Sequence, residues 1–94
     1  MTRERQARLV LRLYVAGSAP NSLRAIANAK AICAEEFAGR HQLEIVDLLQ
    51  HPLRGLADGI IVTPTLLKLA PLPVQRLIGN LADRALLLLS LGGR

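Results

Sequence analysis

The side chains that could carry chemistry are few, and they lie far apart in this chain. There is one cysteine, Cys33, and there are two histidines, His41 and His51, ten residues apart. A metal site needs three or four converging ligands, and neither histidine has a cysteine or a carboxylate at ligand spacing. Asp47 and Asp58 are predicted to be a strand-end residue and a turn residue rather than an acid/base pair. With no phosphate-binding glycine loop either, we predict no enzyme activity, metal or cofactor.

The positive charge does not favour a nucleic-acid partner. The chain has 12 basic and 7 acidic residues, so its net charge is +5. Four of the arginines cluster near the start of the chain, and these are Arg3, Arg5, Arg8 and Arg12. Base stacking needs exposed aromatic rings, and Tyr14 and Phe37 are the only two aromatic residues. A basic arm of this kind suits an acidic patch on a protein partner equally well.

Composition and length predict one globular domain over residues 1–94, with residues 1–7 and 92–94 frayed. A single thiol forms no disulfide within the chain, which suits a reducing compartment. No secretory leader is visible, and the leucine run at 86–89 is far too short to span a bilayer. We therefore expect a cytoplasmic protein with no membrane partner.

The first half of the chain predicts a strand, a helix and a second strand. Apolar residues alternate from Leu9 to Val15, and both faces of this strand are partly apolar, as in a central strand. A turn at 17–22 leads into a helix that ends near Phe37, for which Asn21 or Ser22 is the expected N-cap. The expected buried face comprises Leu23, Ile26, Ala29, Ile32, Cys33 and Phe37. Gly39 should end the helix, and residues 41–47 should form a strand parallel to the first.

The second half predicts a hairpin followed by a helix. Residues 53–58 should form a short helix or turn that Gly59 closes. Residues 65–69 and 74–79 read as two antiparallel strands joined by the turn at 70–73. Asp83 then opens a leucine-rich final helix that runs to about residue 91.

The resulting order is β-α-β-(α)-β-β-α, which resembles the thioredoxin-like α/β fold: a single mixed sheet with helices on both faces. The redox motif of that fold would lie between the first strand and the first helix. Residues 16–22 contain no cysteine, which argues against disulfide exchange. Cys33 is expected to be a buried structural thiol. In this fold the proline before the third strand, here Pro64, follows a cis peptide bond; an ordinary strand-start proline is the equal alternative.

Several sequence blocks with matching spacing resemble the KaiB family over residues 8–91. The first runs from Leu13 to Gly17 and continues as Pro20-Asn21-Ser22. The second is Val62-Thr63-Pro64-Thr65-Leu66, and it is followed by Pro71, Pro73-Val74, Arg76, Ile78-Gly79 and Leu81.

This resemblance implies a regulatory protein that binds the ring of a KaiC-type RecA-like ATPase and modulates its timing or stress-response cycle. Further implied partners are a KaiA-like protein and a SasA-type histidine kinase, and self-association as a dimer or tetramer is also implied. The alternative is a KaiB-like sensor module that competes for the same partner or acts with such a kinase. The family candidates for the ATPase contact are residues 48–58, from which we select Arg54 and Asp58.

The resemblance also implies a metamorphic chain, in which the second half alternates between the thioredoxin-like fold and a KaiB ground-state fold. Pro64, Pro71 and Pro73 are the expected fold-switch positions. KaiB proteins commonly carry Gly-Leu-Asp where this sequence has Ser90-Leu91-Gly92, and they often continue into an acidic tail, whereas this sequence ends at Arg94. We therefore expect this chain to rest in the thioredoxin-like state.

Overall fold

The computed structural model describes residues 8–92, so Arg3 and Arg5 of the basic arm and the ends expected to fray, 1–7 and 93–94, lie outside it. Gly92 is described and forms a turn with its N–H bonded to the Leu89 carbonyl. The elements follow the predicted order: β1 (Leu9–Val15), α1 (Pro20–Glu36), β2 (His41–Asp47), α2 (Pro52–Ala57), β3 (Thr65–Ala70), β4 (Gln75–Ile78) and α3 (Arg84–Ser90).

The four strands form one mixed sheet in the order β2-β1-β3-β4. β1 is parallel to β2 and antiparallel to β3, and β3 and β4 form an antiparallel hairpin. β1 therefore has a neighbour on each side, as its apolar residues on both faces predict. Leu13 in its middle lies opposite Ile45 of β2 and Leu66 of β3, and none of its surface is exposed.

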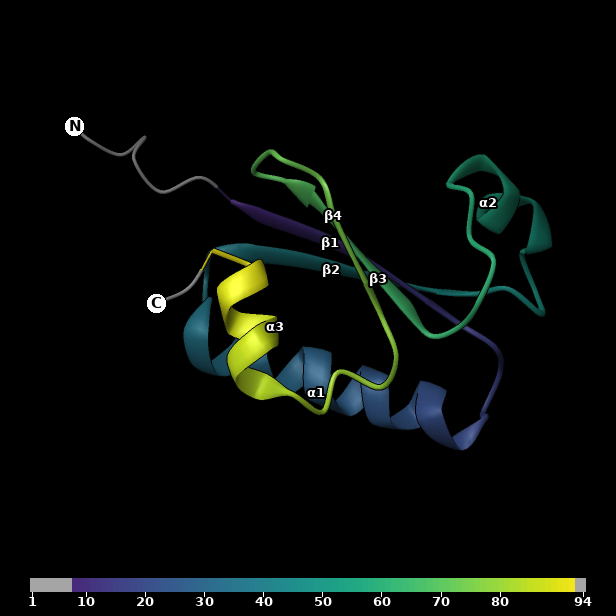
Figure 1. Cartoon of the computed structure of the whole chain (residues 1–94), viewed down its shortest axis with the longest axis horizontal. Coiled ribbons are helices and arrows are strands. Elements are labelled where there is room, and N and C mark those ends of the chain that lie inside the picture. Colours follow the sequence, from purple (N-terminus) through teal and green to yellow (C-terminus); the bar gives the residue numbers. More distant parts are fainter. Residues whose placement is uncertain (1–7, 93–94) are drawn as a thin grey trace.

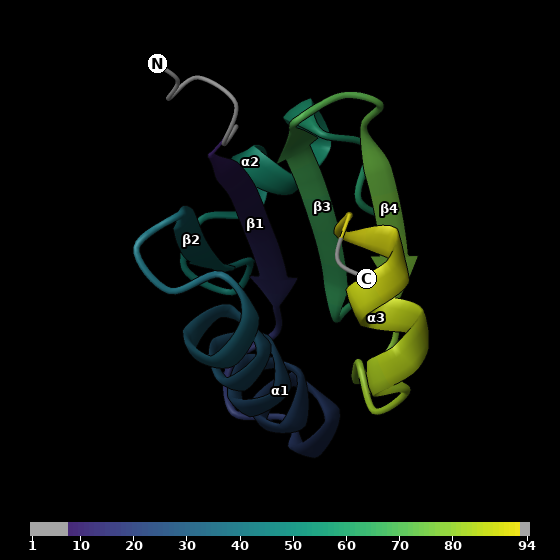
Figure 2. The ribbon, with the colours of Figure 1, turned by 90° about the vertical axis from the view of Figure 1, so that its left-hand side faces the viewer.

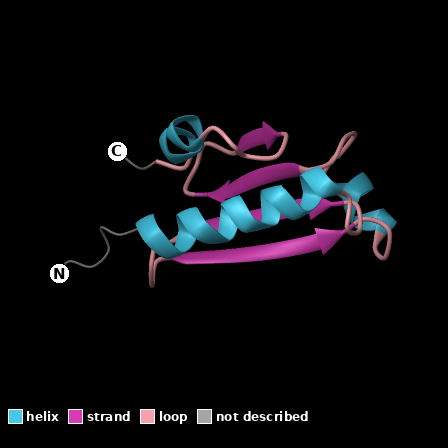
Figure 3. Cartoon of the chain, turned by 90° about the horizontal axis from the view of Figure 1, so that it is seen from below, coloured by secondary structure: helices cyan, strands magenta, loops and turns pink. Residues whose placement is uncertain are grey.

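Helices cover both faces of the sheet, as predicted. α1 and α3 lie on the same side, whereas α2 lies at the far end on the other side (Figures 1 and 2). Figure 3 shows α1 running along the strands over most of their length. The larger core lies between the sheet and α1 with α3, and a second, smaller cluster on the α2 side is formed by Tyr14, Val46 and Leu67.

The start of α1 differs from the prediction. The helix begins at Pro20 with Ala19 as its N-cap, and no side chain caps it. Proline suits the first helical position because its missing N–H would have no partner there. Instead of capping the helix, the Ser22 hydroxyl accepts a hydrogen bond of 3.1 Å from the Ala16 N–H, which fixes the turn that enters the helix.

The buried face of α1 is also rotated at its first turn. Leu23 is 52% exposed, which corrects its predicted place in the core, and Ser22 and Ala25 are buried in its stead. Ser22 is held on this face by its hydrogen bond with the Ala16 N–H. Ala29 and Ile32 are buried as predicted, and Gly39 adopts the positive φ of 74° that suits a helix end.

α3 begins where its capping residue predicts. The Asp83 carboxylate accepts a hydrogen bond of 3.0 Å from the Leu86 N–H, so it satisfies an amide that the first helical turn leaves free. Leu87 and Leu91 are buried against the sheet side, whereas Leu89 is 71% exposed. The leucine run is therefore an amphipathic helix with one face in the core.

Three of the prolines, Pro64, Pro71 and Pro73, lie near the ends of β3. The peptide bonds Thr63–Pro64, Ala70–Pro71 and Leu72–Pro73 are all cis. Pro64 is buried, and Pro71 and Pro73 are exposed in the turn between β3 and β4. β4 is shorter than predicted, because Gly79, at a φ of 114°, already leaves the extended conformation.

Within residues 8–92, no helix combines the length and the apolar character that crossing a bilayer requires.

Candidate protein-interaction site

α2 presents its leucines to solvent. Leu53 and Leu56 are each 75% exposed, and Leu49, just before the helix, is 73% exposed. Gly55 is the one residue of this helix that is buried, and a Cβ at that position would lie 2.9 Å from Leu48 Cδ2. The helix therefore packs its backbone against the sheet side and leaves its apolar side chains unpartnered. We call Leu49, Leu53 and Leu56 the leucine face.

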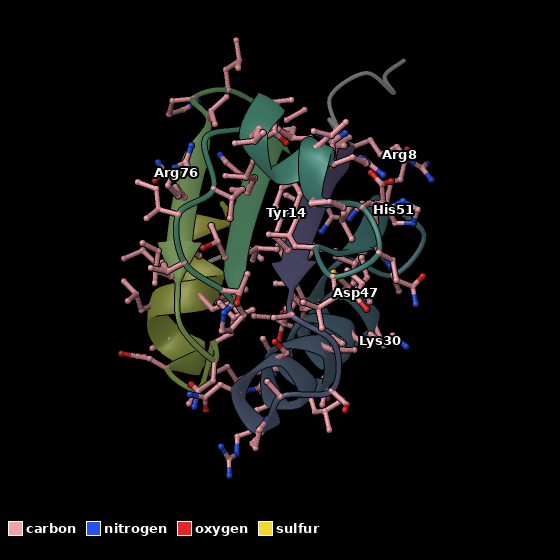
Figure 4. All side chains as sticks on the ribbon, turned by 90° about the vertical axis from the view of Figure 1, so that its right-hand side faces the viewer. Arg8, Tyr14, Lys30, Asp47, His51 and Arg76 are labelled. Atoms are coloured by element: carbon pink, nitrogen blue, oxygen red, sulfur yellow. The ribbon has the colours of Figure 1, made fainter. Side chains whose placement is uncertain are left out.

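Polar groups of β1 attach α2 to the sheet. Tyr14 is 1% exposed, and Figure 4 shows it on β1 beneath α2. Its hydroxyl donates to the Arg54 carbonyl at 3.1 Å and also contacts the Asp58 carboxylate. Arg12, two residues earlier on the same face of β1, donates from Nη1 to Asp58 Oδ2 at 2.9 Å. The middle of the helix and the residue that follows it are thus tied to one strand.

A second tie comes from β2, the edge strand. Glu44 lies opposite Arg12 in the parallel register and accepts from Arg12 Nε at 2.9 Å. It also accepts hydrogen bonds from both terminal nitrogens of Arg54, at 2.6 and 2.9 Å, in the bidentate geometry that an arginine guanidinium allows. The two arginines and two carboxylates of this cluster balance in charge. With Tyr14 they form the group that we call the α2 network: Arg12, Tyr14, Glu44, Arg54 and Asp58.

The third tie comes from β4, at the opposite edge of the sheet. Arg76 donates to the carbonyls of Asp58 and Gly59, at 3.0 and 3.4 Å. These carbonyls follow the last turn of α2, where free acceptors favour a cation. Figure 4 shows Arg76 on one side of α2 and Arg8 and His51 on the other, so an arginine lies on each side of the helix.

The network shifts the proton affinities of its members. Hydrogen bonds from Arg54, and then from Arg12, lower the pKa of Glu44 from 4.5 to about 2. The pKa of Asp58 is also lowered, chiefly by the hydrogen bond from Tyr14. Burial, and then the contact with Asp58, raise the pKa of Tyr14. Both carboxylates are therefore held in their charged form.

We expect the Glu44 ion pairs to make folding stability depend on acidic pH. The pKa of Glu44 is lower in the folded chain, so its stabilisation is complete above pH 4.5 and is lost as pH falls toward 2. Urea unfolding at pH 5 and pH 3 measures this loss, which should be smaller in Glu44→Gln. Gln42→Ala, an exposed neutral change on the same strand, should keep the wild-type difference. Equal losses in Glu44→Gln and wild type would contradict the assignment.

The structure brings together two of the five residues selected from the sequence. Arg54 and Asp58 both belong to the α2 network. The Arg54 side chain is 41% exposed and that of Asp58 is 25% exposed, because both are engaged in ion pairs with the sheet. The prolines at 64, 71 and 73 take no part in this site.

Sequence reasoning missed the rest of the site. Tyr14 was assigned only to a strand, although its alternation with Arg12 already places both on one face of β1. Leu53 and Leu56 stand three residues apart, a spacing that puts them on the same side of a helix. A helix at 53–58 therefore predicts that the two leucines share a face, whereas the pairing of Glu44 with Arg54 cannot be predicted without the folded structure.

Three other residues considered for chemistry, Cys33, His41 and Asp47, are buried or hydrogen-bonded to the backbone. Cys33 is buried, and this burial raises the pKa of its thiol. The His41 ring lies with Nδ1 2.8 Å from the Phe37 carbonyl. Asp47 ends β2 and accepts from the Gly17 and Leu49 amides at 3.0 and 2.9 Å. Within the described part of the chain, no three His, Cys, Asp or Glu side chains gather as metal ligands would.

The sequence profile of the KaiB domain matches residues 12–92. The chain belongs to the KaiB family. A curated relative from Synechococcus elongatus, the circadian clock oscillator protein KaiB, is 48% identical over 82 residues, which cover 87% of this chain and 80% of that protein. The protein of the same name from Prochlorococcus marinus is 46% identical and covers the same share of this chain and 69% of its own length. The resemblance that the sequence blocks indicated is therefore confirmed.

Solved structures confirm the thioredoxin-like fold of this KaiB-family chain. The solution structure of the N-terminal domain of SasA from Synechococcus elongatus superposes with a TM-score of 0.72 at 28% identity, over 88% of this chain and 80% of that one. The thioredoxin Deadhead of Drosophila melanogaster reaches a TM-score of 0.70 at 12% identity, over 85% of this chain and 74% of its own. The second likeness concerns the fold alone.

Proposed function

We propose that this chain is a non-catalytic regulator that binds the ring of a KaiC-type ATPase through the leucine face and modulates the cycle of that ring. The observation that carries this proposal is the outward orientation of Leu53 and Leu56. Apolar side chains that a fold leaves together in solvent are typical of protein-protein contacts. Membership of the KaiB family supplies the class of partner.

The proposal assigns no catalysis because the cysteine thiol is buried and the carboxylates of the α2 network are bound by arginines. Cys33 is the only cysteine of the sequence, and it lies in the core with a raised thiol pKa, whereas a reactive thiol is exposed and has a lowered pKa. Glu44 and Asp58 are charged and bound by arginines, so neither is poised to accept or donate a proton near neutral pH.

The surroundings of the leucine face indicate the chemistry of its partner. Residues 48–57 contain no acidic side chain, and the charge of Arg54 among them is paired with Glu44. Arg8 and Arg76 lie further out. A complementary surface therefore has an apolar centre and an acidic rim, which is the usual arrangement of a specific interface.

The likeness to the N-terminal domain of SasA favours a second candidate function. In it the chain acts as a sensor module that competes for the same ring or works with a SasA-type histidine kinase. Competition with a KaiB protein or with the SasA domain for one ATPase ring distinguishes this candidate from the first.

Size-exclusion chromatography with the KaiC-type ATPase of the same organism and ATP tests the first proposal. We expect a complex with one copy of this chain per ring subunit. We also propose that the fold described here, with α3 helical, is the resting and binding state, so the complex should be complete at the first time point. The absence of a complex with either ATP or ADP would refute ring binding, and formation only over hours would refute the resting state.

A further inference from the structure

We propose that the α2 network is a positioning device: it sets the orientation of α2 and thereby the affinity of the leucine face for its partner. This inference rests on the proposed function and names Tyr14 as the positioning residue at the centre of the device. The starting observation is that α2 has almost no apolar attachment of its own. Gly55 is its one buried residue, and Leu53 and Leu56 point away from the sheet.

A helix of six residues is not stable by itself. His51, its N-cap residue, makes no side-chain capping bond. The partly buried residues that complete the apolar cluster on this side of the sheet lie outside α2: Leu48 and Ile60 flank the helix, and Leu69 belongs to β3. The polar ties therefore decide where the helix lies, and they come from β1, β2 and β4 at once: Tyr14 and Arg12, Glu44, and Arg76.

Tyr14 is the member of the α2 network whose effect on affinity can be distinguished from a direct contact with the partner. Its side chain is 1% exposed, so it cannot touch a partner while α2 is in place. Its hydroxyl reaches both the Arg54 carbonyl, inside the helix, and the Asp58 carboxylate, just after it. Any effect of this hydroxyl on affinity must therefore be transmitted through α2.

Tyr14→Phe removes the hydroxyl and keeps the ring in the apolar cluster. In the free protein we expect hydrogen exchange of the Ile60 amide, which donates to the Gly55 carbonyl at 2.8 Å, to become about tenfold faster, because a hydrogen bond to a charged group is lost. Asp58→Asn, which removes the charge that Arg12 pairs with, should act in the same direction. Ile32→Val changes a buried residue of α1 on the other face of the sheet. It should leave the Ile60 exchange rate unchanged, apart from any contribution of global unfolding.

Affinity for the ring distinguishes a positioning role of Tyr14 from a role in stability alone. We expect Tyr14→Phe to raise the Kd about tenfold in the wild-type background, and by less than about threefold when Leu53 and Leu56 are both alanine. Ile32→Val should leave the Kd unchanged, which excludes a loss of affinity through global destabilisation.

The exchange rate and the binding affinity test different parts of the proposal. An unchanged Ile60 exchange rate in Tyr14→Phe would overturn the positioning role, whether or not the ring binds. Equal effects of Tyr14→Phe with and without the two leucines would also overturn it. If the wild-type chain does not bind the ring although exchange accelerates in the variant, the attachment of α2 stands and the proposed function is wrong.

Discussion

Replacement of Leu53 and Leu56 together by aspartate is expected to reduce binding to the KaiC-type ring by at least about a hundredfold. Each side chain is 75% exposed, so the fold loses little when it becomes charged. In a complex, however, both positions would bury a carboxylate in the apolar centre of the interface. Burial of an unpaired charge is among the costliest changes an interface can undergo. Isothermal titration or size exclusion with the ring measures the loss.

Leu89→Asp is the matched control for this experiment. Leu89 is 71% exposed on α3, on the opposite side of the sheet from α2 (Figure 1). This variant introduces the same charge into a similarly exposed leucine, and it should bind as the wild type does. Equal losses of binding at Leu89 and at the leucine face would show that charge or solubility, rather than the site, determines the effect.

The largest loss of stability is expected from Leu13→Ala. Leu13 has no exposed surface and lies between Ile45 and Leu66 in the centre of the sheet. Strands on both sides prevent the site from collapsing, so the variant should lose roughly 3 kcal/mol of unfolding free energy, within the usual range for a buried leucine. That is a large part of the total for a domain of this size. Urea unfolding followed by circular dichroism measures it.

Leu23→Ala serves as the comparison, because this leucine is 52% exposed on α1. Its cost should be within about 0.5 kcal/mol, since surface changes seldom exceed that amount and alanine favours helix. This comparison also tests the corrected rotation of α1. A loss at Leu23 as large as that at Leu13 would place Leu23 in the core after all.

Local patterns were sufficient to predict the fold because each element carries its own signal. Alternating apolar residues marked β1 as central, and Asp83 marked the start of α3. The prediction was wrong at the start of α1, where Ser22 accepts a hydrogen bond from the Ala16 amide within the preceding turn instead of taking the cap position that Asn21 and Ser22 intrinsically favour. Such a bond depends on how the turn folds, and no periodicity encodes it.

The site was harder to predict than the fold because its contacts join residues that are remote in sequence. Arg12 meets Glu44 only because β1 and β2 pair in a particular register, and it meets Asp58 only because α2 returns over the sheet. Arg54 and Asp58, which were selected from the sequence as partner contacts, form ion pairs with side chains of the sheet. They attach the helix, whereas the neighbouring leucines face outward.

The central place of β1 also has a consequence for synthesis on the ribosome. Its partner β2 follows soon after it, but its other neighbour, β3, begins only at Thr65. At usual translation rates the interval between the end of β2 and the end of β3 is about one to five seconds. During that time a nascent β1-α1-β2 unit carries an open strand edge, which can pair with another chain. Arg12 places a charge in the middle of that edge, and such a charge discourages aggregation of the nascent chain.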